Sequence, residues 1–303
     1  ALRRVEENVA RVIRGKQEAI RLTLTALLAR GHLLIEDIPG VGKTTLAHAL
    51  AQVLGLAWQR LQFTSDLLPA DIIGVSVFDA ASGNFTFRKG PMFTQLLLAD
   101  EVNRASPKTQ SALLEAMEER QVSVDVTTYR LPEPFFVVAT QNPFEQLGTF
   151  RLPESQLGRF LMRISLGYPD AQSERSLLAE GDRRDQLAGM QPVLNPDGVR
   201  ELQAAVQRVH VSSTLLEYVQ ALVASTRQRT DVLLGLSPGA GQGLVRAARA
   251  WAMLAGRNMV IPEDVQAVFA PVASHRLERV GVAAAADHAA FIAELQRGVA
   301  VPV

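Results

Sequence analysis

The sequence of 303 residues contains no cysteine. This absence excludes disulfide bonds and thiolate-ligated zinc, and it fits a reducing, cytoplasmic compartment. Neither sign of charge is in excess, because 31 basic residues balance 31 acidic ones, so nucleic acid is not indicated as a partner. No apolar run approaches the roughly 18 residues that a transmembrane helix needs. The first residue is Ala1 rather than methionine, which leaves open a removed leader or a trimmed chain.

What the chain does contain is a glycine-rich turn between an apolar run and a helical one. Residues 37–45 read Asp-Ile-Pro-Gly-Val-Gly-Lys-Thr-Thr, directly after Leu33–Ile35. Glycines let backbone N–H groups converge on phosphate oxygens, and the helix that follows points its positive end at the same anion. The turn therefore predicts a P-loop that binds ATP. Its predicted phosphate-binding residues are Pro39, Gly40, Val41, Gly42, Lys43, Thr44 and Thr45.

Two side chains of this turn have the chemistry that a nucleotide requires. Lys43 can reach the β- and γ-phosphates, and the Thr44 hydroxyl can ligate Mg²⁺. One position departs from the usual loop, because Asp37 stands where G-x-x-x-x-G-K-[ST] begins with glycine. The alternative interpretation is a helix that begins at a glycine-rich turn and carries an incidental lysine.

Two further apolar runs end in polar residues, as strands of the same sheet would. Gln95–Ala99 is followed by Asp100 and Glu101. Asp100 can hold Mg²⁺ through water, and Glu101 can polarise the attacking water. Residues 135–140 are followed by Gln-Asn-Pro, where the Asn142 amide can contact the γ-phosphate or that water. Taken singly, these signals also fit a strand that merely ends in two acids and a plain Asn-Pro turn.

The apolar periodicity changes along the chain. Strands and helices alternate in the first half, which predicts a parallel sheet covered by helices. After residues 167–170 there is little strand signal. We therefore predict an α/β P-loop core over residues 1–168 and a smaller all-helical lid over residues 169–303. The predicted helices are Glu6–Val12, Glu18–Ala29, Thr44–Leu54, Pro107–Glu119, Gly198–Val209, Ser213–Arg229, Gly241–Leu254 and Pro262–His275.

These motifs together resemble the MoxR family of AAA+ ATPases, from about Val5 to about Val268. The block Asp100–Glu119 is highly specific to that family, and Ala139–Pro143 and Leu152–Phe160 also match it. The resemblance implies an ATPase that uses ATP and Mg²⁺ and assembles as a homo-oligomer, with a hexameric ring as the expected form. It also implies a chaperone-like motor that remodels or matures a protein client, with a von Willebrand factor A-domain protein as one kind of partner.

The resemblance assigns roles to residues outside the loop. Val12 and Ile13 stand where the family packs apolar backbone around the adenine. Arg159 matches the arginine finger, which acts on the γ-phosphate in a neighbouring subunit. The family normally has aspartate before that arginine, and here the residue is Gly158. Two other arginines are less favoured substitutes, and each has a surface ion pair as the alternative: Arg104 and Arg151.

A larger departure lies in the lid. Residues 237–239 read Ser-Pro-Gly where the family usually has Ser-Pro-Arg, so the arginine that would reach the γ-phosphate from the lid is replaced by Gly239. Arg246 lies about 10 Å further along a helix that rises roughly 1.5 Å per residue. We therefore expect slow hydrolysis from the departures at Gly158 and Gly239.

Two segments of the core fit the sheet poorly and read as hairpins. Val75–Phe87 contains Gly-Asn between two apolar stretches, and Gln121–Leu131 alternates valines with polar residues. In the family they correspond to segments that project toward the central pore of the ring and touch the substrate. Without the resemblance, two ordinary surface hairpins would be the better interpretation.

Three functions remain compatible with the sequence. The first is the ATP-hydrolysing motor described above. The second is a nucleotide-binding assembly module with little turnover, which the departures at Asp37, Gly158 and Gly239 favour. The third is a DNA-translocating AAA+ ring, against which the neutral charge counts. The five histidines are scattered, so no metal other than the nucleotide's Mg²⁺ is predicted.

Overall fold

A parallel five-stranded sheet forms the centre of the molecule, which is described by a computed structural model covering residues 1–81, 83–144, 147–179, 183–280 and 285–302. Every strand of this sheet runs parallel to its neighbours, in the order β2–β5–β8–β1–β9. The predicted parallel sheet is therefore confirmed. The strands are β1 (Leu33–Glu36), β2 (Trp58–Gln62), β5 (Leu96–Asp100), β8 (Phe136–Gln141) and β9 (Met162–Ile164).

Alternate residues of the central strands face two different apolar clusters, as the two-residue period of a strand requires. In β1, Leu33 and Ile35 join one cluster and Leu34 joins the other. β5 and β8 divide their side chains in the same way. Because both faces of these strands are buried, they appear in the sequence as continuous apolar runs.

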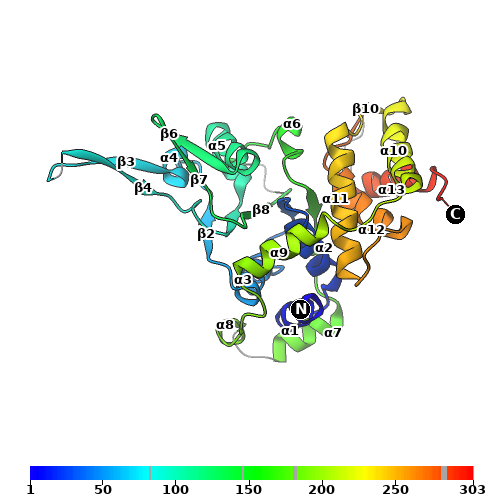
Figure 1. The fold of residues 1–303 in the computed structure, drawn as a ribbon, viewed down its shortest axis with the longest axis horizontal. Coiled ribbons are helices and arrows are strands. Elements are labelled where there is room, and N and C mark those ends of the chain that lie inside the picture. Colours follow the sequence, from blue (N-terminus) through cyan, green and yellow to red (C-terminus); the bar gives the residue numbers. More distant parts are fainter. Residues whose placement is uncertain (82, 145–146, 180–182, 281–284, 303) are drawn as a thin grey trace.

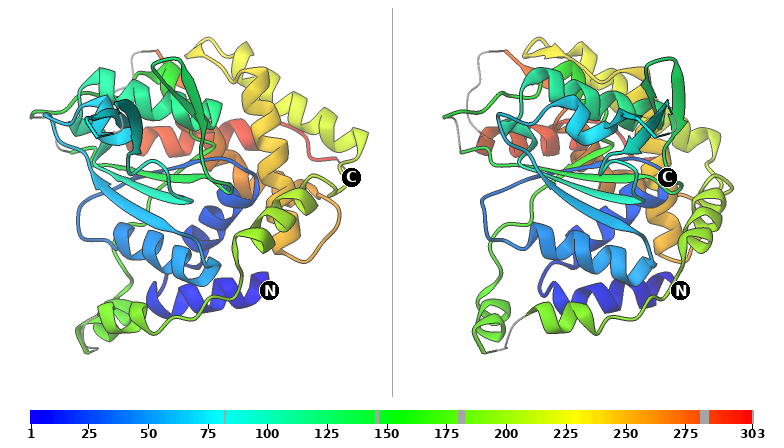
Figure 2. Two further views of the ribbon diagram at one scale, coloured as in Figure 1. Left: turned by 60° about the vertical axis from the view of Figure 1, so that its left-hand side comes forward. Right: turned by 90° about the vertical axis from the view of Figure 1, so that its left-hand side faces the viewer.

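Helices cover both faces of the sheet (Figure 1 and Figure 2). Two short elements follow β2 and β5: the helix α4 (Pro69–Ile73) and the 3₁₀ turn η1 (Val102–Arg104). The predicted core helices are confirmed, with most ends displaced by a few residues. One face of the sheet carries α1 (Leu2–Val12), α2 (Gln17–Leu28) and α3 (Lys43–Leu54), and the other face carries α5 (Pro107–Glu119).

Both predicted hairpins are confirmed. β3 (Gly74–Asp79) pairs antiparallel with β4 (Asn84–Lys89), and the pair protrudes from the core as an arm (Figure 1). β6 (Gln121–Val124) pairs antiparallel with β7 (Thr127–Arg130). The arm and the second hairpin also contact each other through side chains.

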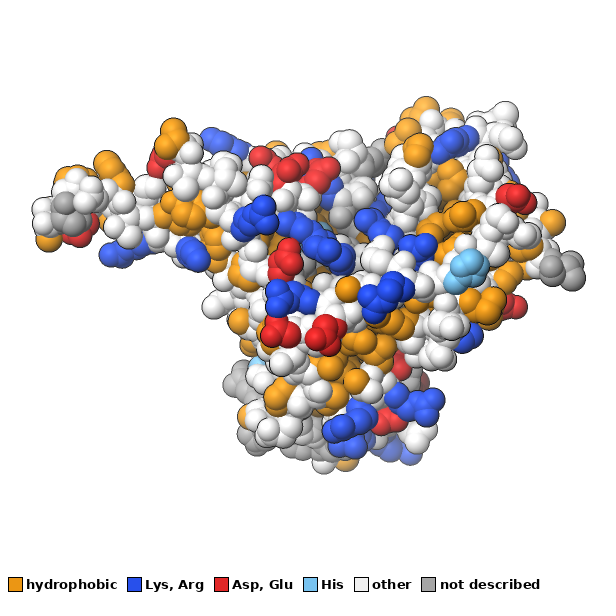
Figure 3. All heavy atoms as spheres, in the orientation of Figure 1, with side chains coloured by type: hydrophobic (Ala, Val, Ile, Leu, Met, Phe, Trp, Pro, Cys, Tyr) orange, Lys and Arg blue, Asp and Glu red, His pale blue; other side chains and the backbone are white. Residues whose placement is uncertain are grey.

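Two contacts tie the arm to the second hairpin. The Ser76 hydroxyl donates a hydrogen bond to Asp125 Oδ2 at 2.8 Å, and Phe87 stacks on Tyr129 with ring centroids 4.2 Å apart. Further out, Phe78 and Phe85 are 55% and 72% exposed. Figure 3 shows hydrophobic side chains on the outer part of the arm. The arm thus presents aromatic surface away from the core.

After residue 168 the chain continues mainly as helices. The first of them return to the core, since α8 contacts α1 and α3, and α9 contacts α2. A short antiparallel pair of strands, β10 (Val232–Leu234) and β11 (Glu278–Arg279), accompanies the helical lid. A domain division at residues 168 and 169 stays a prediction. The helices are α7 (Ala171–Ala179), α8 (Arg183–Ala188), α9 (Pro196–Val206), α10 (Ser213–Gln228), α11 (Pro238–Leu254), α12 (Pro262–Ala273) and α13 (Ala285–Arg297).

Within the described ranges, no helix combines the length and the apolar character that a bilayer-spanning helix requires.

Candidate functional site

The turn between β1 and α3 presents backbone N–H groups at the carboxyl ends of the sheet strands. Gly40 and Gly42 have φ angles of 86° and 98°, in the left-handed region that favours glycine. Helix α3 begins at Lys43, and no side chain of the described residues caps its first turn. The first N–H groups of a helix have no partner within the helix, so this end of α3 can bind a phosphate.

Asp37 anchors the start of this turn. Its Oδ2 accepts hydrogen bonds from the Ser165 hydroxyl at 2.9 Å and from the N–H groups of Leu166 and Gly167 at 2.6 and 2.7 Å. Burial raises the pKa of Asp37, but these hydrogen bonds outweigh it and lower the pKa overall. The carboxylate that replaces the usual glycine therefore fixes the loop to the chain that leaves β9.

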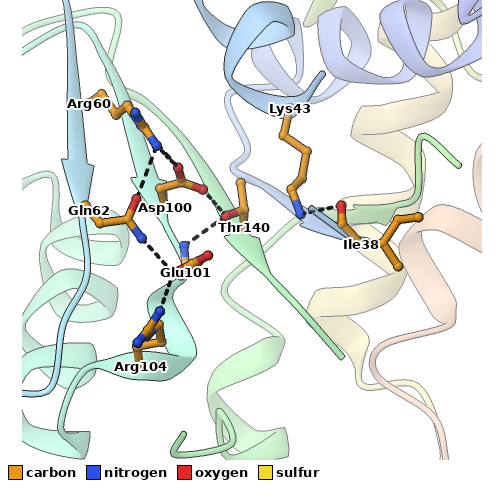
Figure 4. Close-up of polar contacts among 8 residues, drawn as sticks. All are labelled: Ile38, Lys43, Arg60, Gln62, Asp100, Glu101, Arg104 and Thr140. Atoms are coloured by element: carbon orange, nitrogen blue, oxygen red, sulfur yellow. Dashed lines mark hydrogen bonds and ion pairs between the residues drawn. The ribbon is translucent and has the colours of Figure 1, made fainter. Parts of the chain in front are cut away.

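Lys43 lies over the loop and faces the acidic end of β5. Its ammonium donates to the backbone carbonyl of Asp37 at 2.7 Å. It also donates to the backbone carbonyl of Ile38 at 3.1 Å (Figure 4). Burial lowers the pKa of Lys43 below its usual value, and nearby carboxylates, including those of Asp100 and Glu101, oppose that shift. The structure therefore brings Lys43 and both predicted acids to one site.

Asp100 ends β5 and is only 7% exposed. Its two carboxylate oxygens have different partners (Figure 4). Arg60 of β2 donates to Oδ2 from Nη2 at 2.7 Å and from Nε at 3.1 Å. The Thr140 hydroxyl of β8 donates to Oδ1 at 2.6 Å. The strand order explains this convergence, because β2 and β8 flank β5.

Glu101 follows β5 with a φ angle of 57°, which is uncommon for a residue with a side chain. Its N–H donates to Thr140 Oγ1 at 2.9 Å. Its Oε2 accepts hydrogen bonds from Gln62 Nε2 at 2.7 Å and from Arg104 Nη1 at 3.1 Å. Backbone strain of this kind concentrates at functional sites, which agrees with the position of Glu101 at the loop.

Sequence reasoning missed three residues that contact the acids: Arg60, Gln62 and Thr140. The available signal was the alternation of Arg60 and Gln62 in a predicted strand, which places two polar side chains on one face. Of the substitute arginines, Arg104 is ion-paired with Glu101 itself, and Arg151 is exposed. The surface ion pair considered for Arg104 is therefore an ion pair at the candidate site.

Asn142 lies just beyond β8, at the same end of the sheet as the acids. Its Oδ1 accepts a hydrogen bond from the Phe144 N–H at 3.1 Å, so the side chain stabilises a turn. Val12 and Ile13 are buried at the end of α1, in the apolar cluster against which Val41 of the loop packs. Asn142 thus lies at the end of the sheet that carries the loop, Val12 and Ile13 share an apolar cluster with Val41, and the contacts of all three with a nucleotide stay predictions.

Arg159 does not join Lys43 or the two acids. It forms an ion pair with Glu118 at 3.1 Å and lines a cavity of about 560 Å³ beside residues 30–32. Those residues precede β1, whereas the loop follows it, so Arg159 and Lys43 lie at opposite ends of the sheet strands. The charged residues that line this cavity are Arg30, Glu118, Arg120, Arg159, Arg246 and Arg276.

The lid segment that resembles the family's sensor lines the same cavity. Ser237, Gly239 and Arg246 lie there with Arg159. Residue 239 therefore lies away from this chain's own loop, and its role at a γ-phosphate stays a prediction. The reason is packing, because α11 contacts α2 and brings Gly243 against Leu161, at the end of the sheet away from the loop. The absence of an arginine at position 239 therefore removes no contact from this chain's own loop.

The oxygen donors at the loop suit Mg²⁺ that binds together with a nucleotide. Thr44 lies in the first turn of α3 and Asp100 at the end of β5. Mg²⁺ commonly takes one or two protein oxygens and completes its shell with phosphate and water. Across the part of the chain that the structure describes, no group of three or more His, Cys, Asp or Glu side chains could hold a metal ion. A hydroxyl and a carboxylate fit a metal whose remaining ligands are phosphate and water.

Comparison with known proteins finds two family matches in this chain. Residues 32–162 match the ATPase family associated with various cellular activities, called AAA. Residues 224–295 match the AAA lid domain. The first match contains the loop, both acids and Arg159, and the second contains the lid segment beside the arginine-lined cavity.

Close relatives extend over most of the chain. The uncharacterized protein YeaC of Bacillus subtilis is 46% identical over 271 residues, which span 89% of this chain and 85% of the relative. Chaperone MoxR1 of Mycobacterium tuberculosis is 40% identical over 91% of this chain and 75% of the relative. A crystal structure from Cytophaga hutchinsonii matches with a TM-score of 0.88 and 36% identity, covering 99% of this chain and 94% of the other. The chain belongs to the MoxR family of AAA+ ATPases.

Proposed function

We propose that this chain binds ATP with Mg²⁺, hydrolyses it, and couples the reaction to the remodelling or maturation of a protein client. The observation that carries the proposal is the convergence of Lys43, Asp100 and Glu101 at the carboxyl ends of β1 and β5. Membership of an ATPase family supports the same chemistry independently.

Each residue of the site has a proposed role. Lys43 binds the β- and γ-phosphates, Thr44 ligates Mg²⁺, and Asp100 holds the metal through water. Glu101 polarises the attacking water, and Asn142 contacts that water or the γ-phosphate. The remaining proposed contacts with the nucleotide come from Val12, Ile13, Pro39, Gly40, Val41, Gly42 and Thr45.

Arg159 is proposed to act in the site of a neighbouring copy. It cannot serve its own loop, because it lies at the other end of the strands. A ring built from head-to-tail contacts would bring this surface of one subunit to the loop of the next. The arginine-rich cavity beside it complements the negative charge of a triphosphate. We therefore propose a homo-oligomeric ring, with six subunits as the expected size.

The protruding arm is the proposed contact for a protein client. Phe78 and Phe85 offer exposed aromatic surface, and such surface marks interaction sites. A similar protein is named a chaperone, which supports a protein substrate. A von Willebrand factor A-domain protein is the proposed class of partner.

Two substitutions test the catalytic part of the proposal by separating binding from turnover. Glu101→Gln should keep ATP affinity and lower turnover by about a hundredfold or more, because a carboxylate base is lost. Lys43→Ala should weaken ATP binding by about ten- to a hundredfold, because the phosphate loses a charged partner. Steady-state ATPase assays and titration with a fluorescent ATP analogue measure both. Wild-type turnover in Glu101→Gln would remove Glu101 from the mechanism and favour a binding module with little turnover.

A further inference from the structure

A closed set of hydrogen bonds joins Arg60 to both acids at the end of β5 (Figure 4). Arg60 Nη2 donates to Asp100 at 2.7 Å and to Gln62 Oε1 at 3.2 Å. Gln62 then donates to Glu101. Thr140 completes the set, because its hydroxyl donates to Asp100 and accepts from the Glu101 N–H. One guanidinium therefore contacts Asp100 directly and reaches Glu101 through a single amide.

Arg60 serves as the counter-ion of Asp100. A guanidinium that donates twice to one carboxylate makes strong, charge-assisted hydrogen bonds. The Arg60 side chain is 48% exposed, whereas that of Asp100 is 10% exposed. The arginine can therefore move into solvent while the carboxylate stays in place. Any other cation that binds Asp100 must compete with Arg60.

We propose that Arg60 is a positioning residue that holds both acids in the nucleotide-free protein and is displaced from Asp100 when Mg²⁺ arrives with ATP. This inference rests on the proposed function. A free metal ion that displaces Arg60 gains contacts with the protein alone, whereas a metal bound to nucleotide also keeps its phosphate ligands. Arg60 thus restricts metal binding to the moment when nucleotide binds.

The same displacement changes the surroundings of Glu101. Nη2 of Arg60 donates to both Asp100 and Gln62, so its departure leaves the Gln62 carbonyl without this donor. The Gln62 amide is then free to rotate away from Glu101. Loading of the metal site and release of the Glu101 carboxylate are therefore coupled through Arg60.

Binding of Mn²⁺ to the nucleotide-free protein, followed by electron paramagnetic resonance, tests this inference without reference to turnover. Arg60→Gln removes the competing cation and keeps an amide donor, so we expect the Mn²⁺ dissociation constant to fall on the order of tenfold. Arg60→Lys retains the charge and should bind Mn²⁺ as weakly as wild type. Asp100→Asn in the Arg60→Gln background should abolish the gain.

Two outcomes overturn the inference and leave the proposed function intact. One is equal Mn²⁺ affinity in wild type and Arg60→Gln. The other needs no Arg60 variant: tight Mn²⁺ binding by the nucleotide-free wild type that disappears in Asp100→Asn. Failure of the proposed function has a different signature, because Mn²⁺ binding in the presence of ATP would then survive Asp100→Asn. That result removes Asp100 from the metal site and overturns the role of Arg60 with it.

Discussion

Glu101 combines a catalytic assignment with a strained backbone, so its replacement should separate stability from activity. Glycine adopts the observed φ of 57° without the steric cost that a Cβ imposes. We expect Glu101→Gly to be more stable than Glu101→Ala by about 1 kcal/mol. Both variants lack the side chain, so their difference isolates the backbone. Urea denaturation followed by circular dichroism measures it.

A matched pair in a helix gives the control for this comparison. Glu115 is exposed in the interior of α5, where glycine is less stable than alanine by about 1 kcal/mol. The order of glycine and alanine should therefore reverse between positions 101 and 115. The same order at both positions would contradict the left-handed conformation of Glu101.

Buried His32 gives the stability a dependence on pH. Its Nδ1 accepts a hydrogen bond from the Val137 N–H at 3.0 Å, and burial lowers its pKa from 6.5 to about 4. Between these values the unfolded chain binds the proton and the folded chain does not, so stability falls as the pH falls. From pH 7 to pH 5 this residue should remove roughly 2 kcal/mol from the free energy of unfolding. His32→Gln should flatten the dependence measured by urea titrations, and an unchanged slope would refute this origin.

At the scale of single residues, the sequence predicts the groups that a nucleotide contacts and misses those that hold them. Lys43, Asp100 and Glu101 stand in a recognisable local pattern and were predicted. Arg60 and Thr140 become partners of Asp100 only through the register of three strands, which a linear sequence does not specify. The position of Gly239 beside Arg159 is likewise not specified by the linear sequence, because it follows from how α11 packs.

Among the elements, the arm should contribute to client binding and little to stability. Phe85 is 72% exposed, whereas Phe63, which follows β2, is fully buried. Phe85→Ala should change the free energy of unfolding by less than about 0.5 kcal/mol, and Phe63→Ala should cost about 3–5 kcal/mol. Phe85→Ala should also weaken binding of a permanently unfolded probe such as carboxymethylated α-lactalbumin. Undiminished binding in a Phe78→Ala, Phe85→Ala double variant would exclude the arm as the client contact.

Long amphipathic helices were predicted more accurately from the sequence than short strands. The long amphipathic helices α5, α10 and α12 were found with ends close to the observed ones. Strands β9 and β10 have three residues each and β11 has two, so no periodicity reveals them. Helices α7, α8 and α13 were also not predicted. Tertiary contacts stabilise such helices more than a local pattern does. Helix α8, for example, packs on α1 and α3.

For the whole molecule, the opposite placement of Arg159 and Lys43 predicts activity that depends on assembly. Turnover per subunit should rise with protein concentration as rings form. Arg159→Ala and Glu101→Gln subunits should each be inactive, but their mixture should recover turnover. When the two variants are mixed in equal amounts, an intact Glu101 faces an intact Arg159 of its neighbour at about a quarter of the interfaces. ATPase assays with mass photometry measure both quantities.

The control mixture pairs Glu101→Gln with a subunit that carries both substitutions. It forms rings of the same kind but has no intact Glu101, so it should stay inactive. Rings shown to be mixed that recover no activity with Arg159→Ala would place Arg159 in a role within its own subunit.

The position of β1 in the sheet has a consequence for the order in which the protein is made. Its partners are far along the chain. Glu36 and Gln141 are 105 positions apart, and Asp37 and Ser165 are 128 positions apart. A ribosome therefore releases β1 long before β8 and β9 exist, and the early strands cannot close the sheet among themselves. Until residues 165–167 emerge, the loop that begins at Asp37 lacks its anchor. ATP can therefore add its binding free energy to folding only after that point.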